Sequence, residues 1–457
     1  MSGCGCDEYN RGASYRRAAA AGVGLPAIEP GMPKPPGTGL TRRAFVSRTA
    51  GLALAVYGAT SIRLPAFDQG IAQAAAAPPD RVLVSVFLDG GADALSLLFP
   101  DGDPLYRALR PRLALPKDAG SPFAEDPRLR WHPSLASLAT LHGEGKVSVL
   151  PAVGYTHPDQ SHFTSRHYWQ VGATDAHLNV GWLGSYLDRV GTEDNPLQGL
   201  SLGYHLAPQL ATGRMPVATL DSPQNYTYRV PGVYGQVQER MLAAVGEMAH
   251  DSSGDAGVAQ AAKTIVQSAQ LRFQLRSFAA KTGASPVPYP PSDPFPQRLA
   301  TIAALLAAGF PLHVVALSAP GSYDTHSNEA KALDQPLKLT ADSLFAFQRD
   351  LEARGLADRV LVHVWTEFGR RAKENASAGT DHGAAGTGFV IGTQAVGKMI
   401  GEFPGLADGS GLDRNGNLVD TADFRALYST LLEQWLKTDA VGIIPGAAKL
   451  PRYSLVR

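Results

Sequence analysis

Uninterrupted apolar runs recur along the chain and predict buried β-strands. The first, residues 81–88, reads RVLVSVFL and ends in the glycine-rich segment DGGAD. Consecutive apolar residues, without a polar residue at every second position, are typical of a central strand covered on both faces. Similar runs occur at residues 146–153, 312–318, 360–365 and 388–391. Together they predict a sheet buried between helices.

Segments with a helical spacing of apolar residues separate these runs. They lie at residues 254–282, 296–309, 336–353 and 423–436. In the last segment, Asp423 is expected to cap the helix or to lie in its first turn. Strands that alternate with helices predict an α/β fold with a largely parallel sheet, which binds ligands at the carboxyl ends of its strands.

The beginning of the chain is typical of an export signal. Residues 41–48 (TRRAFVSR) contain a twin-arginine pair, an apolar run follows at 51–59, and small residues at 72–77 precede Pro78. Basic residues, a short apolar core and a small-residue cleavage site in this order predict a twin-arginine (Tat) signal peptide. We therefore expect residues 1–76 to be a leader and signal.

Charged residues make a membrane anchor the weaker interpretation of this segment. Arg63 and Asp68 interrupt the apolar residues before the roughly 20 that a membrane span needs, so we expect cleavage and no stable span. The protein would be periplasmic, cell-surface or extracellular, with the Tat translocase as its partner during export. Residues 77–457 are expected to form a single domain with a small insertion around 190–235.

Composition narrows the class of protein further. The 457 residues include 41 basic and 41 acidic ones, and this neutrality argues against nucleic-acid binding. Hydrophobic residues make up 44% and charged residues 18%, so a large core can form. Both cysteines, Cys4 and Cys6, lie in the leader. The body of the chain therefore has no disulfide framework and no cysteine-ligated zinc site.

Acidic residues and histidines flank the predicted strands. Asp324 and His326 follow the third apolar run, Glu367 follows the fourth, and Asp381 and His382 precede the fifth. Carboxylates and imidazoles are ligands that zinc, manganese and similar ions accept. At neighbouring strand ends these side chains would converge on one crevice. Polar residues after strands are also common as caps and turns, so both interpretations stay open.

The order of several motifs along the chain resembles a known family. The chain is similar to the domain-of-unknown-function family 1501, Tat-exported bacterial proteins often described as sulfatase-like. The matching stretches are FLDGGADALSL (87–97), SHFTSRHYWQVG (161–172), GWLGSYLD (181–188), YDTHSNE (323–329), TEFGRRAKENASAGTDHG (366–383) and DFRALYSTLLEQWL (423–436). That family resembles the alkaline phosphatase superfamily. The resemblance implies a three-layer α/β/α sandwich, one or two divalent metals and hydrolysis of phosphate or sulfate esters.

The resemblance also implies a set of metal ligands. Its first acid would be Asp93, in preference to Asp89. The complete implied set is Asp93, Asp324, His326, Glu367, Asp381 and His382. No histidine follows His382, so the superfamily's last ligand is missing. Either Glu367 substitutes for it, or the protein holds one metal or none. The implied ion is divalent: zinc, manganese, calcium or magnesium.

Three residues are candidates for catalysis. Ser161 precedes the helix-like segment 163–171, where a helix N-terminus would favour a developing anion, and a plain N-cap serine is the alternative. His162 lies beside it and is a candidate for the same site. Arg370 could hold an anionic group through two hydrogen bonds, and a surface arginine is the alternative.

These observations favour an exported, metal-dependent hydrolase of small anionic phosphate or sulfate esters. The alternative is a non-catalytic protein of the same fold that binds a ligand or partner at the cell surface, and the missing histidine supports it. A metal-free serine esterase is a third hypothesis, because residues 199–203 (GLSLG) spell the nucleophile-elbow pattern around Ser201. The flanking residues lack the apolar strand and the helix that this turn requires.

Overall fold

The computed structural model describes residues 80–457 except 224–235, 238–239, 241–255, 282 and 292. The predicted leader and signal peptide, and part of the predicted insertion, lie outside the described residues. In the part of the chain that is described, no helix is both long and apolar enough to cross a membrane.

An eight-stranded sheet forms the centre of the described chain, with the strand order β13-β5-β12-β9-β1-β8-β6-β7. The strands are β1 (Val82–Phe87), β5 (Val147–Gly154), β6 (Gly199–Leu202), β7 (Ala218–Leu220), β8 (Val314–Ser318), β9 (Val360–Trp365), β12 (Gly386–Ile391) and β13 (Ala422–Asp423). In this sheet β12 is antiparallel to β5 and β9, and the other neighbours are parallel. The predicted strands and the largely parallel sheet are therefore confirmed.

Both faces of the sheet are covered, as the unbroken apolar runs predict. All residues of β1 are buried; Val82, Val84 and Val86 belong to one hydrophobic cluster, whereas Leu83 and Phe87 belong to another. Because successive side chains of a strand point to opposite faces, each cluster is the core of one face. The described chain is therefore a three-layer sandwich.

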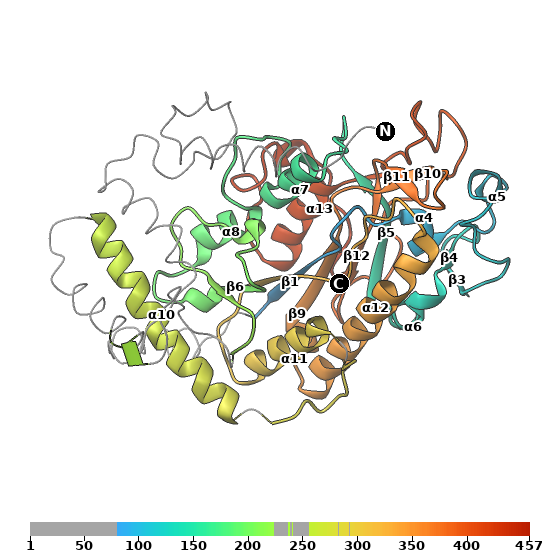
Figure 1. The fold of residues 1–457 in the computed structure, drawn as a ribbon. Helices are drawn as coiled ribbons and strands as arrows, with labels where there is room; N and C mark the ends of the chain where they lie inside the picture. Colours follow the sequence, from blue (N-terminus) through green and yellow to red (C-terminus); the bar gives the residue numbers. More distant parts are fainter. Residues whose placement is uncertain (1–79, 224–235, 238–239, 241–255, 282, 292) are drawn as a thin grey trace, which may run out of the picture. The chain divides into compact units, whose positions relative to one another are not determined.

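Different helices cover the two faces (Figure 1). The first cluster contains residues of α6 (Ala136–Gly143), α10 (Ala256–Lys281), α11 (Pro294–Ala307) and α12 (Glu329–Ala353). The second contains residues of α7 (His162–Val171), α8 (Trp182–Val190) and α13 (Phe424–Thr430), which continues as a π-helical turn, Leu431–Trp435.

Helix α12 begins earlier than the sequence predicts. The spacing of apolar residues predicts a helix over 336–353, but Pro336 lies inside the helix. Leu333 and Leu337, on either side of it, are both buried. Packing on the core therefore stabilises the turn that precedes the proline, and Glu329 becomes the first residue of the helix.

Small sheets and short helices complete the edge of the sandwich. After β9 the chain forms an antiparallel hairpin of β10 (Arg370–Glu374) and β11 (Thr380–His382). A second small sheet has the order β2-β4-β3, with β2 (Leu98–Phe99), β4 (Arg130–Trp131) and β3 (Ser121–Pro122). Between β1 and β4 lie α4 (Ala94–Leu97) and α5 (Tyr106–Leu109).

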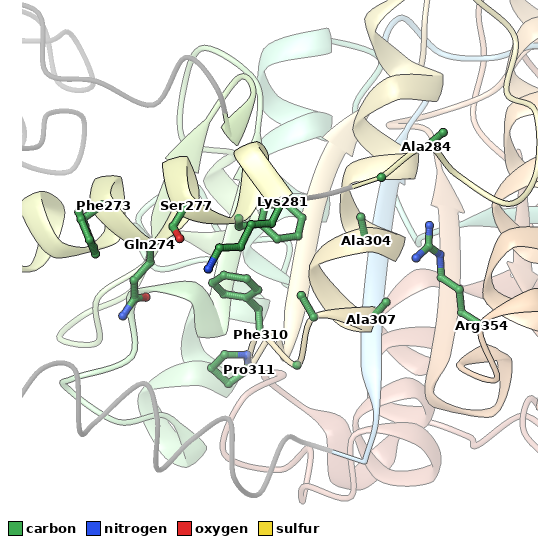
Figure 2. Close-up of a pocket in the computed structure, with 14 residues that line it drawn as sticks. Phe273, Gln274, Ser277, Lys281, Ala284, Ala304, Ala307, Phe310, Pro311 and Arg354 are labelled. Atoms are coloured by element: carbon green, nitrogen blue, oxygen red, sulfur yellow. The ribbon is translucent and has the colours of Figure 1, made fainter.

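A cavity of about 620 Å³ lies between α10 and α11 (Figure 2). Its wall is largely apolar and includes Phe273, Phe278 and Phe310; the charged residues that line it are Lys281 and Arg354. None of the residues that the sequence predicts for metal binding or catalysis lines this cavity. It is therefore separate from the predicted chemistry.

Candidate metal centre

The candidate site lies where parallel strands end. Because β8, β1 and β9 are adjacent and parallel, their carboxyl ends meet at one edge of the sheet. Asp89 follows β1, Asp324 and His326 follow β8, and Glu367 follows β9. The N-terminus of α7 adds His162 to the same edge, where its ring contacts Glu367. The predicted convergence of strand-end residues is therefore present in the structure.

Three imidazole rings surround one carboxylate. One possible ligand atom from each of His162, Asp324 and His382 lies within 4.8 Å of the others. The Nε2 atom of His326 lies 3.1 Å from Asp324 Oδ1 and 3.0 Å from His382 Nε2. We call His162, Asp324, His326 and His382 the metal cluster. Its residues come from α7, the segment after β8 and the β10–β11 hairpin.

In two of these rings, the nitrogen that faces away from Asp324 is held by a hydrogen-bond acceptor. His162 Nδ1 lies 2.8 Å from Glu367 Oε1, and His382 Nδ1 lies 2.8 Å from the backbone oxygen of Gln160. Since an ionised carboxylate and a carbonyl only accept, each Nδ1 carries the hydrogen, and in the neutral ring Nε2 presents its lone pair toward Asp324. Metal-binding histidines are held in this way.

The surroundings also favour the neutral form of His382. Burial lowers the pKa of this residue, and the positive charges of Arg370, His162 and His326 lower it further, outweighing the hydrogen bond to Gln160. A neutral imidazole is the form that binds a metal ion.

Glu367 orients His162 and has no exposed side-chain surface. Its carboxylate accepts hydrogen bonds from the backbone N–H groups of Gly90 (3.1 Å) and Gly91 (3.0 Å) in addition to the contact with His162. Burial alone would raise the pKa of Glu367, but these hydrogen bonds and the charge of Arg166 lower it. Glu367 is therefore an ionised carboxylate that contacts the cluster through His162. The sequence analysis predicts Glu367 itself as a metal ligand.

The glycines of the DGGAD segment allow this contact. Gly90 and Gly91 have φ values of +119° and +71°. A Cβ atom on Gly90 would lie 2.4 Å from the backbone nitrogen of Asp324, and one on Gly91 would lie 2.3 Å from the ring of Phe368. Because Gly90 and Gly91 have no side chain, the backbone fits closely against Asp324 and Phe368. In this position its two N–H groups can donate to Glu367.

Arg370 is buried and supports the cluster from within the protein. Its guanidinium donates to the backbone oxygens of Gly91 (2.8 Å) and Thr380 (3.0 Å) and to Asp324 Oδ1 (2.6 Å). Burial raises the pKa of Asp324, but the hydrogen bond and charge of Arg370, with those of the nearby histidines, lower it overall. The side chain of Arg370 has no exposed surface and these donors point to oxygens of the protein, so its role toward a substrate anion stays a prediction.

Three other predicted residues lie outside the metal cluster. Asp93 is fully buried and pairs with Arg110. Asp381 Oδ1 lies 3.5 Å from His326 Nδ1, so it faces the far nitrogen of that ring. Ser161 is the N-cap of α7, and its Oγ accepts hydrogen bonds from two backbone N–H groups, the nearer at 3.3 Å.

The nucleophile-elbow interpretation of Ser201 does not fit the structure. Ser201 lies within β6, and a 3-10 turn, not an α-helix, is the next element after that strand. Its hydroxyl donates to the oxygen of His205 and accepts from the nitrogen of Ala207, both at 3.0 Å. The sharp turn that exposes a nucleophile is absent there.

Arg166 is a site residue that the sequence analysis missed. It lies one helical turn after His162 on α7, contacts Asp89 Oδ1, and lies 3.4 Å from Glu367 Oε1. Its guanidinium is 4.9 Å from the ring centre of Phe87, and about a third of its side chain is exposed (32%). The spacing of four residues from His162 was the available signal, because it places both side chains on one face of the helix.

A polar cavity of about 800 Å³ adjoins the cluster. Its lining includes His157, Gln160, Asp413, Arg414 and Asn417. Gln160 belongs to both places: its backbone oxygen holds the ring of His382, and its side-chain nitrogen donates to Asn417 at 3.0 Å. Gln160 therefore connects the cluster to a cavity that is lined by hydrogen-bonding groups.

Comparison with known proteins identifies the family. The family model described as "Protein of unknown function (DUF1501)" matches residues 120–434. The chain belongs to the DUF1501 family. The resemblance stated from the sequence is therefore confirmed, and no curated protein matches the chain.

Solved structures that are similar to this DUF1501 protein include a transferase, a sulfatase and a synthase. The phosphoethanolamine transferase EptA of Neisseria meningitidis is 12% identical, covering 88% of this chain and 61% of its own length, with a TM-score of 0.33. The PsFucS1 sulfatase of Pseudoalteromonas is 12% identical, and the match covers 85% of this chain and 74% of the sulfatase, with a TM-score of 0.30. The lipoteichoic acid synthase LtaP of Listeria monocytogenes is 9% identical, and the match covers 88% of this chain and 79% of the synthase, with a TM-score of 0.28.

The chain thus spans 61% of the length of EptA. The predicted α/β/α sandwich with a largely parallel sheet is confirmed by the strand order and by the hydrophobic core on each face.

Proposed function

We propose that this protein is an exported, metal-dependent hydrolase of phosphate or sulfate esters. The observation that carries the proposal is the metal cluster, in which three imidazole Nε2 atoms and the Asp324 carboxylate converge. The order of motifs shared with the DUF1501 family and, through it, with the alkaline phosphatase superfamily supports the reaction class.

The chemistry of the cluster fits a divalent cation. His162 Nε2 is buried and has no hydrogen-bond partner among the described residues. His326 and His382 present facing nitrogens 3.0 Å apart, which repel each other as lone pairs unless a proton or a cation lies between them. Three imidazoles and one carboxylate suit zinc or manganese, whereas calcium and magnesium prefer oxygen ligands. Zinc or manganese is therefore the expected ion.

The residues around the cluster would have separate roles in ion binding and substrate binding. A bound divalent ion supplies Lewis acidity toward a phosphoryl or sulfuryl oxygen. Glu367 and the Gln160 carbonyl hold two rings in the binding tautomer, and Arg370 holds Asp324. Arg166, partly exposed at the edge of the cluster, would donate charge-assisted hydrogen bonds to the anionic ester. The adjoining polar cavity would accept the rest of the substrate.

The nucleophile in this proposal is either Ser161 or a water molecule. Ser161 Oγ accepts hydrogen bonds at the N-terminus of α7, and among the described residues no acceptor for its own hydrogen is found. Replacing Ser161 with alanine separates the two routes, because a serine route would lose most of its rate and a water route would keep it.

Metal content is the experiment that tests the proposal. The protein would be purified folded from metal-replete cells, and its bound metals measured by elemental mass spectrometry. We expect about one zinc or manganese ion per chain, lost in the Asp324→Ala/His382→Ala variant and kept in His177→Ala, a matched change of an exposed histidine. A chelator should abolish hydrolysis of 4-nitrophenyl phosphate or sulfate. A metal-free, well-folded parent would contradict the hydrolase and favour a ligand-binding protein of the same fold.

Export through the Tat pathway is the second part of the proposal. The twin arginines Arg42 and Arg43 precede an apolar run and a small-residue site. Because Tat substrates fold before export, the ion would be loaded in the cytoplasm. Replacing both arginines with lysine should retain the protein in the cytoplasm, and immunoblots of cell fractions would show it. Equal export of the variant and the parent would contradict this route.

A further inference from the structure

A second group of ionisable side chains lies next to the loops of the metal cluster and is buried. Asp93, Arg110 and Glu329 each expose 1% of the side chain or less. Arg110 donates to both carboxylate oxygens of Asp93, with Nη2 2.9 Å from Oδ1, and its Nη1 lies 3.9 Å from Glu329 Oε1. Buried charges are costly unless they are paired and hydrogen-bonded, so this arrangement requires specific partners.

Glu329 connects this group to the loops that carry three of the four cluster residues. Its Oε2 accepts hydrogen bonds from Thr325 Oγ1 (3.1 Å) and from Thr380 Oγ1. Thr325 stands between Asp324 and His326, and Thr380 is the first residue of β11, whose last residue is the third cluster histidine. One carboxyl group thus holds the residue adjacent to two cluster members and the strand that carries another.

The backbone joins the same two loops at this point. Thr380 N donates to Thr325 O at 3.0 Å, and Glu329 N donates to Ala378 O at 2.9 Å. The other oxygen of Glu329 accepts from Ser96 Oγ of α4 at 2.9 Å. Both oxygens of the carboxyl group are therefore occupied, and its position is fixed from α4, from α12 and from both loops.

We propose that Glu329 is a positioning residue that keeps the loops of Thr325 and Thr380 in register and thereby sets the spacing of the His326 and His382 rings. Glu329 acts through the two threonine hydroxyls, because its hydrogen bonds go to them and to Ser96. Its effect on metal affinity rests on the proposed function, whereas its effect on loop order does not.

Hydrogen exchange of the metal-free protein tests the loop order. The variants are Glu329→Ala, Glu329→Gln and Thr325→Val/Thr380→Val, and mass spectrometry would follow peptides that cover 322–328 and 376–383. We expect exchange at least about tenfold faster in the alanine and valine variants, because local opening becomes easier. The glutamine variant should stay near the parent, because its amide oxygen still accepts from both hydroxyls.

Asp350→Asn is the matched control. Asp350 is another fully buried carboxylate of α12, and it binds Arg354, Ser285 and Tyr289 away from the cluster loops. Its replacement should lower global stability without faster exchange in the two loops. If Glu329→Ala leaves loop exchange at the parental rate, or if Asp350→Asn accelerates it equally, the positioning role is refuted.

Zinc affinity provides the second measurement, by competition with a chromophoric chelator. Loss of a residue that supports metal ligands weakens binding by about 10–100-fold, which we expect for Glu329→Ala, with the glutamine variant within about threefold of the parent. Cobalt substitution should give an altered visible spectrum in the alanine variant. Failure of the parent to bind zinc, combined with the expected exchange pattern, would refute the metal proposal and leave the positioning role supported.

Discussion

Glu367 is an ionised side chain that the interior tolerates because its charge is fully used. Two backbone N–H groups, His162 and Arg166 surround it, which offsets much of the cost of removing a carboxylate from water. The same contacts fix the ring of His162. A residue next to the ligands can therefore decide the geometry of the cluster as much as the ligands do.

Replacing Glu367 with glutamine tests this role. The amide keeps the size of the side chain but removes the negative charge that holds the Nδ1 hydrogen of His162, so zinc affinity should fall about 10–100-fold with the fold retained. A competition titration and circular dichroism would measure both. Glu433→Gln, which removes a surface partner of Arg452, is the control and should leave affinity unchanged. Unchanged affinity in Glu367→Gln would contradict the role.

The titration of Glu329 predicts how stability depends on pH. Burial, together with the charge of Asp93, raises the pKa of Glu329 from 4.5 to about 8, although Arg110 opposes this. Between those values the folded chain holds a proton that the unfolded chain has released, so this group makes stability fall as the pH rises from about 4.5 to about 8.

Glu329→Gln does not titrate and should lose less stability over this range than the parent. Urea unfolding of both proteins near pH 5.5 and pH 8.5, in the presence of a chelator, would measure the difference. If the parent and the variant lose equal stability, Glu329 does not hold a proton in the folded protein.

At the scale of elements, the turn from β1 into α4 couples the sheet to the site. Gly91 lies against Phe368, whose ring is 4.9 Å from that of His162 and 4.8 Å from that of His382, measured between centroids. The turn thus needs a positive φ and also leaves room for a ring that packs on two cluster histidines.

Gly91→Ala should therefore cost more than the backbone strain alone. Gly355 also has a positive φ (+68°), but no atom lies within 4 Å of the position its Cβ would take. Gly355→Ala should cost about 1 kcal/mol of stability, and Gly91→Ala should cost about twice that or more and also weaken zinc binding. Urea unfolding and zinc titration of both variants would show it. Equal costs and unchanged zinc binding would mean that Phe368 adjusts freely.

At the scale of the whole molecule, the cluster joins parts of the chain that are distant in sequence. Its side chains come from α7, from the segment after β8 and from the β10–β11 hairpin, whereas the sheet is stabilised by hydrophobic cores on both faces. In the proposed function, a bound ion would thus join these parts and add stability to that of the hydrophobic cores.

Zinc should raise the unfolding temperature of the chelator-treated protein. At a free concentration of about 100 times its dissociation constant, a ligand that binds only the folded state adds about 2.7 kcal/mol. For a domain of this size that corresponds to several degrees. Differential scanning calorimetry would measure it, with His382→Ala as the control that shows no rise. The absence of a shift in the parent would argue against a specific site.

The sequence by itself determined the elements and much of the site. The apolar runs predicted β1, β5, β8, β9 and β12 of the covered sheet, and Asp324, His326 and His382 were predicted as ligands from their places beside strands. The strand prediction succeeds because burial on both faces leaves a pattern that can be read locally, whereas the ligand roles of the three residues stay predictions. Asp423 was predicted to cap the helix or to lie in its first turn; it is the N-cap of α13, and its side chain accepts from Arg425 N at 2.7 Å.

The tertiary structure alone decided which side chain performs which role. The local sequence patterns around Arg370 and Arg166 do not show which of the two guanidinium groups is buried. The structure buries Arg370 and leaves Arg166 partly exposed. Glu329, Glu367 and Gln160 each contact a partner that is far away in the sequence, namely Ser96, His162 and His382. The physical reason is that apolar spacing is a local property, whereas the orientation of a polar side chain depends on which donors and acceptors the folded chain brings within about 3 Å of it.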